Sequence, residues 1–261
     1  MTLAPSPLPP IAGPAGPRPA IAGDWCYRPH PLPAGTPQAV CFPHAGGDVT
    51  AFAGLAAALA PTLEVWAIRL PGRGGRFVDP MPATFAALVT AVIDGLAPYL
   101  QPGALFYGQS FGALLAFEVA RSLPAASRPR IVIPACAAPP PGWPGSIPPT
   151  SEGAADLLER CGLATALPDD ETIRELAVAT IRTDLTVCRS YRYHPSPRPD
   201  FAIHAVAGAD DTALRPATLA GWAEATTGCF TASTEPGGHL LATPLSAGPA
   251  DLLRTLHLGR S

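Results

Sequence analysis

Lysine is absent from this chain of 261 residues, and all 17 of its basic residues are arginines. Against 20 acidic residues they leave a formal net charge of −3, with an isoelectric point near 6.0. The charges are dispersed along the sequence, so no basic run provides the electrostatic footprint that nucleic-acid binding requires. We therefore expect no nucleic-acid partner.

The sequence also lacks the cysteine patterns of metal sites. Its six cysteines lie far apart and form neither a C-x-x-C pair nor a His/Cys cluster with metal-ligand spacing. We interpret them as buried, reduced thiols, and we expect no metal ion and no redox cofactor. They are Cys26, Cys41, Cys136, Cys161, Cys188 and Cys229.

Features of a secretion signal or a membrane span are missing as well. The N-terminal stretch MTLAPSPLPPIAGPAGPRPA has no basic n-region and is broken by prolines throughout. We expect a cytoplasmic protein that does not enter the membrane. Residues 1–23 are predicted to be a flexible Pro/Ala-rich tail that cannot bury a core, and residues 24–261 to be the folded domain.

What the chain does contain is an alternation of short apolar runs and helical patterns, in a composition that is 48% hydrophobic. This alternation is typical of an α/β fold, in which helices flank both faces of a mostly parallel sheet. The length is sufficient for one large domain with a buried core. The expected strands are 38–42, 64–69, 104–107, 130–134, 201–207 and 229–233, and the expected helices include 51–59, 84–96, 111–122, 214–225 and 249–256.

The pattern changes between residues 137 and 199, which we interpret as an insertion. A Pro-rich stretch, APPPGWPGSIPP, is followed by two amphipathic segments before the next strand. In the second segment, apolar residues at helical spacing form one stripe: Ile173, Leu176, Ala177, Ile181 and Leu185. A packed surface helix and a helical lid over a site are equally compatible with this stripe, and its position in the chain suits a lid.

The central functional signal is the sequence GQSFG at 108–112, which joins an expected strand directly to an expected helix. This is the pattern of a nucleophile elbow, in which a serine on a sharp turn has a strained backbone that flanking glycines accommodate. The helix that begins at Phe111 directs its free N–H groups towards charge that develops beside Ser110. Ser110 is therefore the candidate nucleophile.

A serine hydroxyl needs a base, and the base needs an orienting carboxylate. Both are expected downstream of the serine, in the order acid and then histidine. The expected strand 201–207 runs into GADD, and PGGH ends at His239 just after the last expected strand. Strand-end acids commonly take the fourth place of a G-x-x-D turn, which selects Asp211 over Asp210. The predicted catalytic residues are Ser110, Asp211 and His239.

The oxyanion of such a reaction needs two N–H donors. One is the backbone amide of Phe111, and the other is expected from a loop after an early strand. The sequence CFPHAGG at 41–47 is such a loop, small and glycine-rich, so its backbone can approach a ligand closely. We predict the Ala45 N–H as the second donor, with a simple tight turn as the alternative. His44 precedes the nucleophile in the chain and is not predicted as the base.

Together these segments resemble the type II thioesterases that accompany polyketide and nonribosomal peptide synthases. The resemblance covers nearly the whole chain after the N-terminal tail and rests on CFPHAGG, PGRGGR, GQSFGALLAFE, DLTVCRSYRY, GADD and PGGH. It implies an α/β-hydrolase fold with a helical lid. Carried across, it also implies a nucleophile at Ser110, an acid at Asp211, a base at His239 and oxyanion donors at Ala45 and Phe111.

The family likeness implies a stand-alone enzyme that hydrolyses acyl thioesters from the phosphopantetheine arm of acyl or peptidyl carrier proteins. The arm belongs to the substrate, so no cofactor is expected, and we expect a monomer. Three alternatives stay open. They are a chain-releasing thioesterase that forms a lactone or ester, a small-molecule esterase, and a binding protein of the hydrolase fold. The last typically lacks a triad residue, and this chain lacks none.

Two positions depart from the family pattern. Gln109 stands where the family usually has His, and Arg189 stands where it often has Glu. Neither change removes a predicted catalytic group, so we expect an active enzyme. Because carrier proteins are usually acidic around their modified serine, Arg73 and Arg76 are candidate docking residues. A solvated structural loop is the favoured alternative for these two arginines.

Overall fold

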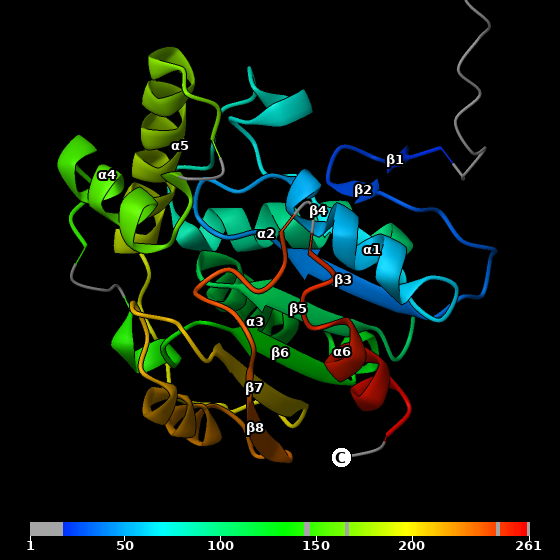
Figure 1. The fold of residues 1–261 in the computed structure, drawn as a ribbon. Coiled ribbons are helices and arrows are strands. Elements are labelled where there is room, and N and C mark those ends of the chain that lie inside the picture. The colour runs from blue at the N-terminus through cyan, green and yellow to red at the C-terminus, as the bar shows by residue number, and fades with distance from the viewer. Residues whose placement is uncertain (1–17, 144–146, 165–166, 244–245, 260–261) are drawn as a thin grey trace, which may run out of the picture.

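A mixed sheet of eight strands forms the centre of the computed structural model, which describes residues 18–143, 147–164, 167–243 and 246–259 (Figure 1). The strand order is β1-β2-β4-β3-β5-β6-β7-β8; β1 pairs with β2, and β2 with β4, in antiparallel fashion, and the other pairs are parallel. The strands are β1 Ala20–Ala22, β2 Cys26–Arg28, β3 Gln38–Phe42, β4 Glu64–Ile68, β5 Leu105–Gln109, β6 Ile131–Ala135, β7 Ala202–Gly208 and β8 Phe230–Glu235.

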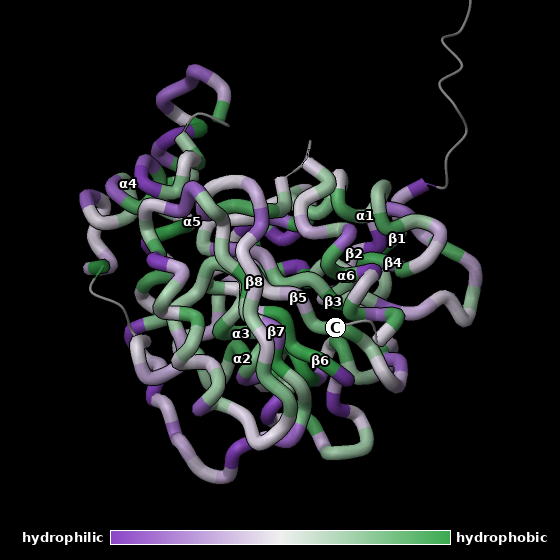
Figure 2. Tube along the Cα trace, turned by 60° about the horizontal axis from the view of Figure 1, so that its bottom comes forward, coloured by the Kyte–Doolittle hydropathy of each residue, from purple (hydrophilic) through white to green (hydrophobic). Residues whose placement is uncertain are grey.

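Helices cover both faces of the sheet because side chains of successive strand residues point to opposite faces. Phe106 of β5 packs in one core with α2 (Phe85–Leu96) and α3 (Phe111–Ser122). Tyr107, the next residue, packs in a second core with α1 (Ala53–Leu59) and α6 (Ala250–His257). In Figure 2 the hydrophobic colour accordingly concentrates on the central strands. This arrangement confirms the predicted α/β fold class.

The predicted insertion contains two helices, α4 (Ser151–Arg160) and α5 (Glu171–Arg189), which lie side by side at one edge of the molecule (Figure 1). Each begins with a side-chain cap: Thr150 accepts from the Gly153 amide, and Asp170 from the Ile173 amide. Within the predicted stripe of α5, Ile181 and Leu185 are buried, whereas Ile173 and Leu176 are exposed. Residues 144–146 and 165–166 of the insertion lie outside the described ranges.

All six predicted parallel strands are present, each within two residues of its expected ends. The predicted helix 214–225 is instead a 3₁₀ segment, η7 (Pro216–Ala225). The expected helix 51–59 begins as another 3₁₀ segment, η1. Further 3₁₀ turns complete the connections: η1 Val49–Phe52, η2 Gly74–Arg76, η3 Ala97–Tyr99, η4 Ala125–Ser127 and η5 Pro140–Gly142.

Two other sequence-based expectations need correction. The predicted tail ends too late, because Ala20–Ala22 form β1 and pair with β2; residues 1–17 lie outside the described part. All six cysteines are described, and all are unpaired, but Cys229 is exposed because it precedes the edge strand β8. Within the described ranges, no helix is long and apolar enough to cross a membrane.

Candidate active site

Ser110 lies at the carboxyl end of β5, where the chain turns directly into α3. Its backbone angles, φ 53° and ψ −118°, are ones that a residue with a side chain adopts only under strain. A Cβ on Gly108 would lie closer than 3.0 Å to the backbone of Gly112. A Cβ on Gly112 would approach the carbonyl oxygen of Phe42 equally closely. The turn therefore requires glycine on both sides of the serine.

His239 lies between Ser110 and Asp211 and is hydrogen-bonded to both. Its Nε2 is 3.0 Å from Ser110 Oγ, and its Nδ1 is 2.9 Å from Asp211 Oδ2. The three residues follow β5, β7 and β8, so the carboxyl ends of parallel strands bring them together from distant parts of the chain. With Nδ1 protonated, the ring donates to the carboxylate and accepts from the serine hydroxyl. In this arrangement His239 can accept the proton of the Ser110 hydroxyl.

Asp211, and not Asp210, is the carboxylate that contacts His239. Its second oxygen, Oδ1, accepts from the amides of Ala213 (2.8 Å) and Leu214 (3.0 Å). Burial raises the pKa of Asp211, but the hydrogen bonds from His239 and from the two amides outweigh burial and lower the pKa below its usual value. Asp210 is exposed to solvent. Asp211 is therefore ionised at neutral pH and oriented through both oxygens.

The environment of His239 favours its protonated form. Burial lowers the pKa of His239, but hydrogen bonding to Asp211 and the nearby Cys161 thiol outweigh burial and raise the pKa to about 9. Cys161 follows the last turn of α4, so this helix reaches across to the histidine. His239 must lose a proton before it can act as a base, which sets the direction of any pH dependence.

The two amides predicted to bind the oxyanion both lie beside the elbow. Phe111 begins α3, and the loop that contains Ala45 follows β3, the parallel neighbour of β5. In the described part of the chain, neither N–H donates a hydrogen bond to another residue. Free donors near Ser110 can stabilise negative charge on an oxygen that is bonded to the serine. Their role in the reaction stays a prediction.

A pocket of about 200 Å³ opens at Ser110 and His239. Its walls are mostly apolar, and two of its lining residues, Leu157 and Arg160, come from α4. The helical insertion therefore contributes part of the pocket wall beside the candidate nucleophile. The other lining residues are Cys136, Ala138, Gly142, Trp143, Ile147, Ala213 and Leu214.

The thioesterase-domain family model matches residues 37–257 of this chain. The chain belongs to the thioesterase family. It is 30% identical to a probable cadicidin biosynthesis thioesterase of Streptomyces griseus, over 92% of this chain and 68% of that protein. Two solved structures are also similar. The RedJ thioesterase of the prodiginine pathway of Streptomyces coelicolor has 31% identity and a TM-score of 0.75, with 88% of each chain covered. The type II thioesterase BorB of the borrelidin cluster has 28% identity and a TM-score of 0.73, with 89% of this chain and 94% of that chain covered.

These similarities make the protein a hydrolase of thioesters with the α/β-hydrolase fold, related to thioesterases of polyketide and nonribosomal peptide pathways. In this thioesterase Gln109 replaces the histidine that is usual in the elbow, and its side chain makes three hydrogen bonds. Its Oε1 accepts from the Tyr107 hydroxyl and from the Ala242 amide, both at 2.9 Å. Its Nε2 donates to the Ala242 carbonyl at 3.3 Å. Gln109 thus ties the elbow to the loop that carries His239.

Sequence reasoning missed Cys136 of this thioesterase, which lines the pocket beside Ser110. In the described ranges, Ser110 and Cys136 are the two non-glycine residues with a positive φ, and the φ of Cys136 is 50°. They follow adjacent strands, β5 and β6, and a position just after a parallel strand was the available signal. Burial raises the pKa of Cys136 to about 12, and its thiol donates to the Gly238 carbonyl at 3.8 Å. The neutral thiol therefore supports the loop that ends in His239.

The structure does not support the docking role predicted for Arg73 and Arg76, because both side chains are engaged within the protein. Arg73 is buried in an ion pair with Asp184, with 5% of its side chain exposed. Arg76 pairs with Asp79 at 2.7 Å and stacks on Trp25, 4.3 Å from the ring centre. In a sequence, a buried arginine cannot be distinguished from an exposed one when its partner lies far away in the chain.

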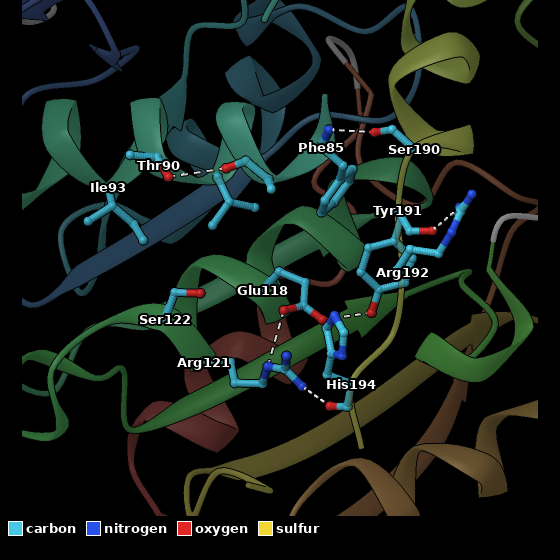
Figure 3. A pocket seen from close by; sticks show the side chains of 12 residues that line it. Phe85, Thr90, Ile93, Glu118, Arg121, Ser122, Ser190, Tyr191, Arg192 and His194 are labelled. Atoms are coloured by element: carbon cyan, nitrogen blue, oxygen red, sulfur yellow. Dashed lines mark hydrogen bonds and ion pairs between the residues drawn. The ribbon is translucent and has the colours of Figure 1, made fainter. Parts of the chain in front are cut away.

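A larger cavity, of about 430 Å³, lies away from Ser110 between α2, α3 and the segment after α5 (Figure 3). Tyr191 donates to the buried Glu118 at 2.6 Å, and Arg121 pairs with the other oxygen of Glu118 at 3.1 Å. None of the predicted catalytic residues lines this cavity. Arg189, which stands where the family often has Glu, also lies outside the candidate active site. Its side chain is exposed at the end of α5 and does not line the pocket at Ser110.

Proposed function

We propose that this thioesterase is a stand-alone enzyme that hydrolyses acyl thioesters on the phosphopantetheine arm of carrier proteins, in the cytoplasm beside a polyketide or nonribosomal peptide synthase. The observation that carries the proposal is the hydrogen-bonded chain from Ser110 through His239 to Asp211, at the end of an apolar pocket. The names of its relatives, a thioesterase of cadicidin biosynthesis and a type II thioesterase of the borrelidin biosynthetic cluster, support the choice of substrate class.

In the proposed reaction, Ser110 Oγ attacks the thioester carbonyl while His239 takes the hydroxyl proton. The Ala45 and Phe111 amides donate to the oxygen that becomes negative. The C–S bond then breaks, and His239 returns its proton to the departing thiolate. Water, deprotonated by the same histidine, attacks the acyl-serine, and collapse of that second intermediate releases a free acid and restores Ser110. Asp211 stays ionised and stabilises the imidazolium.

The size of the pocket supports hydrolysis over chain release with ring closure. About 200 Å³ has room for a short acyl chain, whereas drug-sized ligands occupy pockets of about 300–1,000 Å³. A long chain that folds back to bring its own hydroxyl to the carbonyl needs more room than a short chain and one water molecule. We therefore favour removal of short acyl groups that block a carrier.

The test uses a phosphopantetheinylated carrier protein charged with acetyl or butyryl groups. The purified enzyme should release the free acid and regenerate the thiol, and Ser110→Ala should abolish release above the spontaneous rate. Treatment with a sulfonyl fluoride should add one adduct, at Ser110, by intact-mass spectrometry. The oxygen ester of the same acyl group distinguishes a thioesterase from a small-molecule esterase, because an esterase would cleave the oxygen ester at least as well as the thioester. Equal release by wild type and Ser110→Ala would refute the proposal.

A further inference from the structure

Asp184 and Arg73 form a buried ion pair that joins the lid helix α5 to the loop beside Ser110. Two nitrogens of Arg73 bind the two carboxylate oxygens, at 2.8 Å and 2.5 Å, and the Asp184 side chain has no exposed surface. The carboxylate also accepts from the Gly46 amide at 2.7 Å, and Arg73 donates to the Gly47 carbonyl at 3.3 Å. The buried Asp184–Arg73 pair is therefore hydrogen-bonded to the loop that contains Ala45.

Around Ala45, three of the four polar groups of the two adjoining peptide units are already bound. The His44 carbonyl accepts from the Gly47 amide at 2.9 Å, and the Ala45 carbonyl accepts from Nδ1 of His44 at 2.9 Å. The Gly46 amide donates to Asp184. Burial lowers the pKa of His44 to about 4, so its ring stays neutral at pH 7. In the described part of the chain, the Ala45 N–H alone has no partner among these four groups.

The part of α5 that carries Asp184 is anchored to the body of the protein. Ile181, one turn earlier, packs on Gly46 so closely that a Cβ there would lie 2.5 Å from its side chain. Just after the helix, Ser190 accepts from the Phe85 amide at 2.7 Å and Tyr191 donates to Glu118 (Figure 3). This half of the lid helix is thus a fixed support, and it can hold the loop in one position.

We propose that Asp184, with its charge balanced by Arg73, is a positioning residue that holds the Ala45 amide where the oxyanion forms. The inference rests on the proposed function. Fixing the peptide unit after Ala45 leaves the unit before it, which carries the free N–H, little freedom to rotate. Arg73 is needed because an unbalanced carboxylate so close to the site would oppose the negative charge that develops there. The helical insertion therefore has two roles: α4 forms part of the pocket wall, and α5 holds the loop that carries the Ala45 amide.

The test replaces both members of the pair, by Arg73→Met with Asp184→Leu, so that no buried charge is left unpaired. The probe substrate is the butyryl thioester of N-acetylcysteamine. We expect kcat to fall about 10- to 100-fold while KM changes little, because a donor misplaced by a fraction of an ångström weakens only the transition state. The matched control is Arg76→Met with Asp79→Leu, an ion pair of the same loop region that, among the described residues, makes no hydrogen bond or ion pair with residues 44–47. It should keep the wild-type kcat.

A second measurement separates positioning from a purely structural role. A butyryl trifluoromethyl ketone reacts with serine hydrolases by addition of the serine oxygen to the carbonyl carbon, with the proton passing to histidine and the carbonyl oxygen becoming negative. Its affinity should fall by the same factor as kcat in the double variant. The matching amide, which forms no oxyanion, should bind as tightly as to wild type. A general loosening of the fold would weaken both ligands alike.

Asp184→Asn provides the rescue, because its side-chain oxygen can still accept from the Gly46 amide, and it should retain more kcat than the double variant. If the double variant does not fold, His44→Phe tests the same peptide unit, since it removes the donor to the Ala45 carbonyl and keeps a ring against Gly47. Wild-type kcat and ketone affinity in a folded double variant, or in His44→Phe, would overturn the inference. Failure of the proposed function is distinct, because the wild type itself would then cleave no thioester.

Discussion

Asp211 uses its two oxygens for different partners, one for His239 and one for the Ala213 and Leu214 amides. An asparagine there keeps the shape, but its NH₂ group favours the imidazole tautomer that cannot accept the Ser110 proton. We expect Asp211→Asn to lower kcat by up to about 10⁴, the loss found in the serine-protease template. A thiolate leaves more readily than an amine, so the loss here can be smaller.

The control for Asp211→Asn is the neighbouring Asp210→Asn. Asp210 is exposed, and its one hydrogen bond to another described residue runs from its backbone amide to the Gly237 carbonyl at 2.9 Å. Its variant should keep kcat close to the wild-type value. Steady-state kinetics on one thioester, run side by side, give the comparison. A large loss of kcat in Asp210→Asn, with little loss in Asp211→Asn, would mean that Asp210 is the catalytic carboxylate.

The pKa of His239 gives a second prediction at this scale. Only the neutral ring can accept the Ser110 proton. Burial lowers the pKa of His239, but the Asp211 carboxylate and the Cys161 thiol together raise it from 6.5 to about 9. The value of kcat/KM should therefore increase with pH, with a midpoint above 6.5 and towards 9. Asp211→Asn should shift the midpoint downwards, because the raising charge is gone. The measurement is a pH profile corrected for spontaneous thioester hydrolysis, and a profile with its midpoint below 6.5 would contradict it.

Single residues divide clearly into those that the sequence can identify and those that it cannot. Ser110 could be identified because the elbow is contiguous in the chain, and His239 because it ends a short motif after a strand. Arg73 was misinterpreted because its partner Asp184 lies 111 positions away. His44 was set aside as a base, and its structural role depends on the folded loop. Contacts that form only in the folded chain determine both roles.

At the scale of elements, the elbow depends on how closely α3 approaches the end of β3. A Cβ on Gly112 would lie closer than 3.0 Å to the carbonyl oxygens of both Phe42 and Pro43, which are backbone atoms that cannot rotate away. Gly112→Ala should therefore reduce the free energy of unfolding by more than about 4 kcal/mol, or prevent folding. Chemical denaturation followed by circular dichroism measures this change.

The matched control for Gly112→Ala is Gly238→Ala. A Cβ at Gly238 meets no atom within 4 Å, and its backbone φ is not positive. Its free energy of unfolding should stay within about 0.5 kcal/mol of wild type, the range of ordinary surface substitutions. An equal loss of unfolding free energy in the two variants would show that the close approach of α3 to β3 is not the reason why residue 112 must be glycine.

Strands β3 to β7 were predictable because each is a short, mostly apolar run that is buried and bounded by turn residues. The edge strand β8 is partly exposed and carries a weaker signal. β1 and β2 were missed because each has only three residues, and because β1 pairs only with β2 and β2 joins the rest of the sheet only through β4. The 3₁₀ form of η7 was missed because Pro216 and Gly221 interrupt a pattern that otherwise favours a helix. Local propensity predicts an element, but packing decides its hydrogen bonding.

At the scale of the whole molecule, no strong field attracts an acidic carrier protein. The net charge is −3, and at physiological salt charges are screened over about 8 Å, so local side chains matter more than the total. Arg73 and Arg76 are occupied by internal partners. On the proposed function, recognition of the carrier therefore depends on the arm and on contacts at the pocket, because a net charge of −3 provides no steering of an acidic partner from a distance.

The last prediction concerns the oligomeric state, which we expect to be monomeric. A sheet with free edges can pair with a second copy, but β1 has only three residues and the exposed positions of β8 are mostly polar. Among the described residues, the large exposed hydrophobic side chains are few and scattered over the chain, as is normal for a monomer: Ile21, Phe77, Val78, Ile173, Leu176 and Leu258.

Sedimentation equilibrium at several protein concentrations tests this directly. The mass should stay at 26.8 kDa at every concentration, and the specific activity should not change on dilution, because the residues predicted to act all come from one chain. A mass that doubles with concentration would contradict the prediction and would point to β8, the edge strand with the longer free side. Replacing Thr234 at an exposed position of β8 by Lys would then restore the monomer, because a charge on an edge strand opposes pairing with a copy of itself.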